Sequence, residues 1–174
     1  MIIVISGTPG TGKHLIGKKL SERLGYKLLD LNKILKSGKK GEVEVSIPEI
    51  NRIVARSISG NMVIVSHLGH FIRSKKVSLW VVLRCRPLVL YKRLLKRGYS
   101  KQKIYDNAMF EAIDGCYVES KSLHKNTIQI DNTHNPDKTV DEIINAMKGK
   151  KHPNNKVDYS SEIPSIEKII SSAA

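Results

Sequence analysis

Short apolar runs rich in valine and isoleucine alternate with amphipathic stretches from Ile2 to Met147. The apolar runs have the length of buried strands and predict strands at 2–6, 26–29, 62–65, 77–83 and 126–131. The stretches that follow them predict helices at 15–24, 33–36, 48–59, 88–97, 101–121 and 136–147. Strands that alternate with helices favour an α/β fold, in which a parallel sheet is flanked by helices on both faces.

Three stretches fall outside this alternation. Residues 37–41 form a basic, glycine-containing stretch that predicts a turn, and residues 42–47 alternate with period two, which predicts a small strand or an extended arm. After Gly149 the chain becomes polar and proline-broken, and isoleucines then recur at helical spacing from Ile163. We therefore expect one domain over 1–149 and a tail over 150–174, made of a linker and a C-terminal helix. The tail is expected to dock on the domain or on a partner, or to be disordered.

The segment Gly7–Lys13 reads GTPGTGK and joins the first predicted strand to the first predicted helix. It matches the P-loop pattern G-x-x-x-x-G-K in the strand–loop–helix context that the pattern requires. Glycines let backbone N–H groups point inward at a phosphate, and the helix N-terminus adds a favourable dipole. We expect this loop, Thr11 included, to hold the phosphates of ATP, with Lys13 reaching the β- and γ-phosphates. The alternative is a strand-to-helix turn that is merely rich in glycine.

Two positions depart from the usual way in which a P-loop protein holds Mg²⁺. The residue after the lysine is ordinarily serine or threonine, whose hydroxyl is a metal ligand, but here it is His14. The predicted strand 62–65 should end near an acidic residue that holds the same ion, but it ends in Val65 and Ser66. Imidazole suits softer metals than Mg²⁺, which prefers oxygen. Mg²⁺ is still expected for the reaction, without identified protein ligands.

The strongest compositional feature is positive charge, because 30 Lys and Arg stand against 16 Asp and Glu and give a net charge of +14. Such a charge implies anionic partners, either nucleotides or nucleic acid, and favours RNA over a nucleotide alone. The alternative is a solvated basic surface. No apolar run approaches the roughly 18 residues of a membrane helix. The start of the chain does not resemble a signal peptide, and two cysteines in no metal or redox spacing favour a reducing cytoplasm.

Several basic side chains are candidates for binding substrate phosphates. Arg52 and Arg56 lie one turn apart on a predicted helix. Arg84 follows the most hydrophobic strand, at the end that faces the ligand crevice in open α/β sheets, so substrate binding and a structural salt bridge are both open. Two histidines, His67 and His70, lie three residues apart, and with His14 they suggest a metal cluster; the alternative for His70 is a surface or packing role.

The stretch from Val82 to Asn107 carries a more specific pattern. It reads Val-Leu-Arg at 82–84, and later Arg-Gly-Tyr-Ser-x-x-Lys-Ile-x-Asp-Asn at 97–107. Together with the GTPGTGK loop and Ser-His-Leu at 66–68, it resembles the adenylate kinase isoenzyme 6 family over about residues 1–147. The resemblance implies a P-loop NTPase with a parallel sheet like that of the nucleoside monophosphate (NMP) kinases, a segment that binds the monophosphate at 30–53, and a short lid at 96–106.

The resemblance also implies roles for particular residues. The ATP-binding positions fall on Gly10, Gly12, Lys13, His14 and Leu15. Arg97 falls on the lid arginine that contacts the nucleotide, His67 falls on the histidine of an Asp-x-His motif, and Asp30 opens the monophosphate-binding segment. Members of that family carry adenylate kinase and ATPase activity and act in late maturation of the small ribosomal subunit beside a ribosomal protein.

Two functions are therefore expected to compete, and a third, a kinase for another small hydroxylated metabolite, agrees less well with the pattern at 97–107. In the first, the protein is an NMP kinase and ATPase in which Lys13, Arg97 and His67 carry the chemistry. In the second, it is a ribosome assembly factor that binds nucleotide but has lost most of its catalysis. His14 and Val65 favour the second function because both replace metal-side residues of the family.

Overall fold

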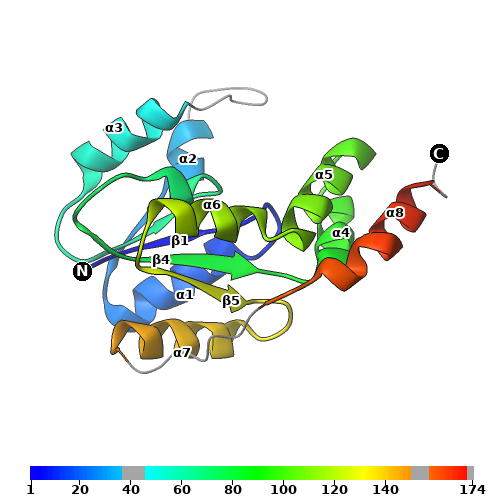
Figure 1. Ribbon diagram of the computed structural model, residues 1–174. Helices are drawn as coiled ribbons and strands as arrows, with labels where there is room; N and C mark the ends of the chain where they lie inside the picture. Colours follow the sequence, from blue (N-terminus) through cyan, green and yellow to red (C-terminus); the bar gives the residue numbers. More distant parts are fainter. Residues whose placement is uncertain (37–45, 150–156, 172–174) are drawn as a thin grey trace.

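Five parallel strands form one sheet at the centre of the protein. The structure, a computed structural model, describes residues 1–36, 46–149 and 157–171. The sheet contains β1 (Ile2–Ser6), β2 (Lys27–Asp30), β3 (Met62–Val65), β4 (Val77–Arg84) and β5 (Thr127–Asp131), in the order β2-β3-β1-β4-β5 (Figure 1). All five predicted strands are confirmed, with ends that differ by at most one residue. β1 pairs with β3 on one side and with β4 on the other, so the loop that follows it leaves the sheet between two neighbouring strands.

Helices cover both faces of the sheet (Figure 1). One face carries α1 (Lys13–Leu24) and α7 (Pro136–Met147), and the other carries α2 (Leu31–Lys36), α3 (Ile47–Ser57), α6 (Gly115–Leu123) and the short helix η1 (Gly69–Phe71). Three further helices, α4 (Pro87–Lys96), α5 (Lys101–Ala112) and α8 (Ile163–Ser171), pack together beyond the carboxyl ends of the strands, and η2 (Ser160–Glu162) precedes α8. The α/β fold with a flanked parallel sheet is therefore confirmed.

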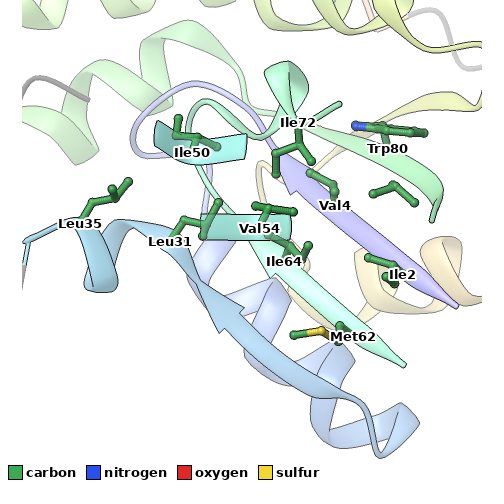
Figure 2. Packing of buried hydrophobic residues seen from close by; sticks show 11 residues of the cluster. Ile2, Val4, Leu31, Leu35, Ile50, Val54, Met62, Ile64, Ile72 and Trp80 are labelled. Carbon is green, nitrogen blue, oxygen red and sulfur yellow. The ribbon is translucent and has the colours of Figure 1, made fainter. Parts of the chain in front are cut away.

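The two faces of the sheet have separate apolar cores because successive strand residues point to opposite sides. In β1, Ile2 and Val4 join the core beneath α2 and α3, whereas Ile3 and Ile5 join the core beneath α1 and α7. Figure 2 shows the first of these cores, into which Trp80 also packs. Burial of each such side chain contributes about 1.5–3 kcal/mol. These cores fix the carboxyl ends of the strands, where the candidate site lies.

The single helix expected over 101–121 is wrong, because the structure contains two helices, α5 and α6, in this stretch. The break lies at Asp114, which has a left-handed backbone with φ of 61°. Aspartate adopts this conformation more readily than most residues. The Oδ1 atom of Asp114 lies 2.6 Å from Nη2 of the buried Arg84, so the break also carries an ion pair to the end of β4.

Other sequence predictions fall partly outside the described residues. The basic turn at 37–41 and most of the extended stretch at 42–47 lie outside the described residues. Ser46, which is described, is the N-cap of α3, and its hydroxyl accepts a hydrogen bond from the Glu49 N–H. None of the helices in the described ranges is both long enough and apolar enough to span a membrane.

The C-terminal segment packs against the helices beyond the sheet. Glu162 is the centre of this contact, because one carboxylate oxygen accepts from Nε of Arg86 at 2.6 Å and the other accepts from the backbone N–H of Leu88 at 3.0 Å. Leu88 lies in the first turn of α4, where N–H groups have no partner within the helix. Ile166 of α8 is buried against α5. Of the fates open to the tail, the segment 157–171 therefore docks on the domain.

Substitution of Glu162 by glutamine is expected to lower the free energy of unfolding by about 1–3 kcal/mol, because two hydrogen bonds to a charged acceptor are weakened. Equilibrium denaturation measures this change. Glu22→Gln, in an exposed surface pair with Lys18 on α1, is the matched control and should change the stability by less than about 0.5 kcal/mol. Equal effects of the two variants would contradict the role given to Glu162.

Candidate active site

The loop between β1 and α1 has the conformation of a phosphate cradle. Gly12 is the N-cap of α1 with φ of 93°, in the left-handed region that glycine tolerates, and no side chain caps the helix. A Cβ atom at this position would lie 2.5 Å from Nδ2 of Asn132, so the close approach also requires glycine. The first N–H groups of α1 have no partner within the helix and remain available to an anion.

The carbonyl groups of the same loop are held by other parts of the protein. The carbonyl oxygen of Gly10 accepts from Nη1 of Arg93 at 3.2 Å, and that of Thr11 accepts from Nδ2 of Asn132 at 2.8 Å. The hydroxyl of Thr11 donates to the carbonyl of Thr8 at 2.9 Å, so it supports the loop from inside. These contacts fix the backbone of the loop in its observed conformation.

Lys13 is almost fully buried and folds back on the loop. Its ammonium donates to the carbonyl oxygens of Gly7 at 2.7 Å and Thr8 at 2.9 Å. Burial lowers the pKa of Lys13 to about 8, because desolvation penalises the charged form. A phosphate bound at the loop would supply the negative charge that this buried ammonium lacks.

A cavity of about 280 Å³ opens above the loop. Its lining comes from the P-loop, from α2, from the end of β3 and from the segment after α4, and includes these predicted site residues: Gly10, Gly12, Lys13, His14, His67 and Arg97. Tyr99 lines it beside Arg97. The structure therefore brings the loop lysine and the predicted lid arginine to one cavity, although they are far apart in the sequence.

The other predicted site residues do not line this cavity. Leu15 is 46% exposed on the outer side of α1, and Arg52 and Arg56 are exposed on α3. Asp30 lies behind the cavity wall, where its Oδ2 is 2.6 Å from Nδ1 of His14.

The prediction that Arg84 binds substrate is wrong. The structure shows the alternative, a structural salt bridge. The Arg84 side chain is 1% exposed, and its Nε donates to Oε1 of Glu111 at 2.7 Å. Nη1 donates to Gln129, and Nη2 donates to the Glu111 carbonyl and pairs with Asp114. The guanidinium also lies over the Tyr159 ring, at 5.3 Å from its centroid. Its donors are thus occupied inside the protein, where no substrate phosphate reaches them.

Three residues that support the P-loop were missed by the sequence analysis. Arg93 and Asn132 hold loop carbonyls, as described above. Glu111, which is 1% exposed, accepts hydrogen bonds from the Thr8 hydroxyl and from the Cys85 N–H at 3.1 Å. Only the buried position of a charged residue distinguishes Glu111, and burial is not visible in a single sequence.

The residues present do not fit Mg²⁺ held by a loop hydroxyl and a strand-end carboxylate. Mg²⁺ prefers oxygen ligands, but the position after Lys13 offers an imidazole and Val65 at the end of β3 is an apolar side chain that is 1% exposed. The three-histidine cluster is not present either. Within the described residues, no group of three or more His, Cys, Asp or Glu side chains is placed to hold a metal. His70 is instead buried, with Nδ1 at 2.8 Å from the Ser6 hydroxyl.

Comparison with known proteins places this site in a family. A family model described as an AAA domain matches residues 3–114. A protein named "Putative adenylate kinase" from Pyrococcus abyssi is 40% identical over 168 residues, with 92% of each chain covered. A protein of the same name from Thermococcus onnurineus is 37% identical over 170 residues, with 93% of each chain covered. Another, from Methanocaldococcus jannaschii, is 33% identical over 171 residues, with 92% of this chain and 93% of that chain covered. The chain belongs to the same family as these proteins.

Solved structures of other proteins share the fold of this chain. Shikimate kinase from Acinetobacter baumannii, in complex with shikimate, has a TM-score of 0.65 at 16% identity, with 86% of this chain and 94% of that chain covered. Shikimate kinase from Bacteroides thetaiotaomicron has a TM-score of 0.63 at 16% identity, with 85% and 98% covered. The fold is thus that of a P-loop kinase.

Nucleotide binding is expected to take up a proton near pH 8, because phosphate charge raises the pKa of Lys13 above its value of about 8 in the free protein. The affinity for ATP should therefore fall by up to about tenfold per pH unit above pH 8, until the pKa of the bound form is reached. Calorimetry in two buffers of different ionisation enthalpy measures the uptake. Lys13→Met should abolish it, and uptake that persists in this variant would assign the proton to another group.

Proposed function

We propose that the protein is a nucleoside monophosphate kinase that transfers the terminal phosphate of ATP to a monophosphate such as AMP. The observation that carries this proposal is the convergence of the P-loop, Lys13 and Arg97 on one cavity. The names of the archaeal relatives support the same activity.

The arrangement suits phosphoryl transfer because this reaction depends mainly on positioning and on stabilising charge. Inward N–H groups of the loop would hold the ATP phosphates. Lys13 would exchange the carbonyls of Gly7 and Thr8 for phosphate oxygens, and Arg97 would approach the same phosphates from the opposite wall. A divalent cation bound together with the nucleotide would supply further charge neutralisation.

The acceptor is proposed to bind on the side of His67. A second hollow of about 310 Å³ shares Pro9 and His67 with the first cavity, and both phenylalanines of the chain, Phe71 and Phe110, line it. Two adjoining cavities provide room for two ligands whose phosphates meet at the loop. His67 is held for this position, because its Nδ1 lies 2.7 Å from Oδ1 of Asn32. Asp30 and Arg52 would belong to a monophosphate-binding segment at 30–53, Arg56 would follow it on α3, and residues 96–106 would form the lid.

A phosphotransfer assay tests the proposal. The full chain is incubated with ATP, a divalent cation and each of AMP, CMP, GMP and UMP, and the diphosphate products are separated from ADP formed by hydrolysis alone. We expect turnover in the ordinary enzyme range of about 1–1000 per second with at least one acceptor. Nucleotide binding without acceptor-dependent turnover, with Mg²⁺ and with Mn²⁺, would overturn the proposal.

The charge of +14 favours a second candidate function, the binding of small-subunit ribosomal RNA or of a ribosomal protein during assembly. This function would place the protein in the cytoplasm. Binding to rRNA should weaken steeply between about 50 and 200 mM salt, because counterions are released from the RNA. Filter binding to small-subunit rRNA at several salt concentrations measures the slope. Absence of binding, or binding that does not depend on salt, would refute this candidate.

A further inference from the structure

The imidazole of His14 is held in one orientation by a carboxylate. Its Nδ1 lies 2.6 Å from Oδ2 of Asp30. The other oxygen of Asp30 accepts hydrogen bonds from the N–H groups of Asn32 at 3.0 Å and Lys33 at 3.3 Å, at the start of α2. The carboxylate is therefore fixed by the backbone and cannot turn away from the ring.

This contact decides which ring nitrogen has a free lone pair. An ionised carboxylate only accepts hydrogen bonds, so Nδ1 of a neutral His14 carries the proton and Nε2 carries the lone pair. No partner is recorded for Nε2 among the described parts of the chain. The side chain is 52% exposed and lines the cavity next to Lys13. A nitrogen that can ligate a metal thus lies where the P-loop pattern has a hydroxyl that ligates Mg²⁺.

We propose that Nε2 of His14 is a ligand of the divalent cation that accompanies the bound nucleotide, and that this cation is one that accepts nitrogen, such as Mn²⁺ or Co²⁺, in preference to Mg²⁺. The proposal rests on nucleotide binding at the P-loop, which is part of the proposed function. Imidazole is a common ligand of transition metals, whereas Mg²⁺ strongly prefers oxygen.

The pair with Asp30 is the second observation behind this assignment. Histidines that bind metals almost always donate their other N–H group to a carboxylate, a carbonyl or water, which fixes the ring and makes the ligand more basic. Asp30 lies opposite Val65 in the register of β2 and β3. The end of β3 lacks a carboxylate, but Asp30 supplies one on the neighbouring strand β2. This carboxylate would orient His14 and would not bind the metal itself. Asp30 is a positioning residue in this arrangement.

The test is pulsed electron paramagnetic resonance of Mn²⁺-ATP bound to the full chain. Protein labelled with ¹⁵N-histidine distinguishes the imidazole from the nitrogens of adenine. We expect ¹⁵N coupling to Mn²⁺ in the unsubstituted protein and none in His14→Thr, which restores a hydroxyl and keeps the loop. His67→Asn is the matched control and should retain the coupling.

Affinity measurements give a second readout. Asp30→Asn is expected to weaken Mn²⁺-ATP binding by about 10–100-fold, as for other groups that orient a metal-binding histidine. In His14→Thr the preference for Mn²⁺-ATP over Mg²⁺-ATP should be lost. Bound Mn²⁺-ATP without ¹⁵N coupling, or coupling that persists in His14→Thr, would overturn the proposal. Failure to bind ATP with either metal would overturn the proposed function as well, whereas ¹⁵N coupling in a protein without phosphotransfer would overturn only the proposed function.

Discussion

Replacement of Glu111 by alanine is expected to lower the free energy of unfolding by about 3–5 kcal/mol, because it leaves the buried guanidinium of Arg84 without its main counter-ion. The Thr8 hydroxyl and the Cys85 N–H lose their acceptor in the same variant. Since Thr8 belongs to the P-loop, ATP affinity should fall together with stability. Chemical denaturation and nucleotide titration of the same sample measure both effects.

The double variant Arg84→Met, Glu111→Leu provides the control for this prediction. It removes both charges and replaces them with apolar groups of similar size, so it should be less destabilised than Glu111→Ala alone. A double variant that is less stable than the single variant would mean that the loss of packing, and not the uncompensated charge, explains the effect.

The second large effect is expected for Lys13→Ala, which should lower phosphotransfer turnover by about 10²–10³-fold, as does removal of one charge-stabilising donor in other enzymes. Folding should be retained, because the ammonium is buried at a cost in desolvation that lowers its pKa to about 8. Steady-state rates at saturating ATP measure the loss. Lys18→Ala is the matched control, since Lys18 is exposed on the same helix and makes a surface pair with Glu22 at 3.9 Å. Similar losses in both variants would exclude a specific role for Lys13.

The parts of the fold that were predicted correctly depend on local patterns. The strand 2–6, the glycine loop and the helix after it are neighbours in the sequence, and their arrangement follows from strand length, glycine spacing and helical periodicity. The same holds for β3, β4 and β5. The break at Asp114 was missed because no local pattern predicts its left-handed backbone, and its partner Arg84 lies thirty positions earlier in the chain.

The candidate site was predicted less completely for the same reason. Lys13 and Arg97 were identified from motifs, and the structure brings both to one cavity. Arg84 was placed near the substrate because it ends a strand, and the sequence does not reveal that Glu111 covers it. The pairing of His14 with Asp30 crosses from α1 to β2, so it becomes visible only when the sheet is formed.

The strand order also has a consequence for synthesis of the chain. β1 is made first, but both of its neighbours come much later, because Ile2 pairs with Met62 on one side and with Val77 on the other. The nascent chain therefore exposes β1 with two open edges until β3 has left the ribosome, and with one open edge until β4 has followed. Such non-local pairing slows folding and leaves time for aggregation. Translation pauses or chaperone contacts between the emergence of β1 and that of β4 should decide how much of the protein reaches its native state.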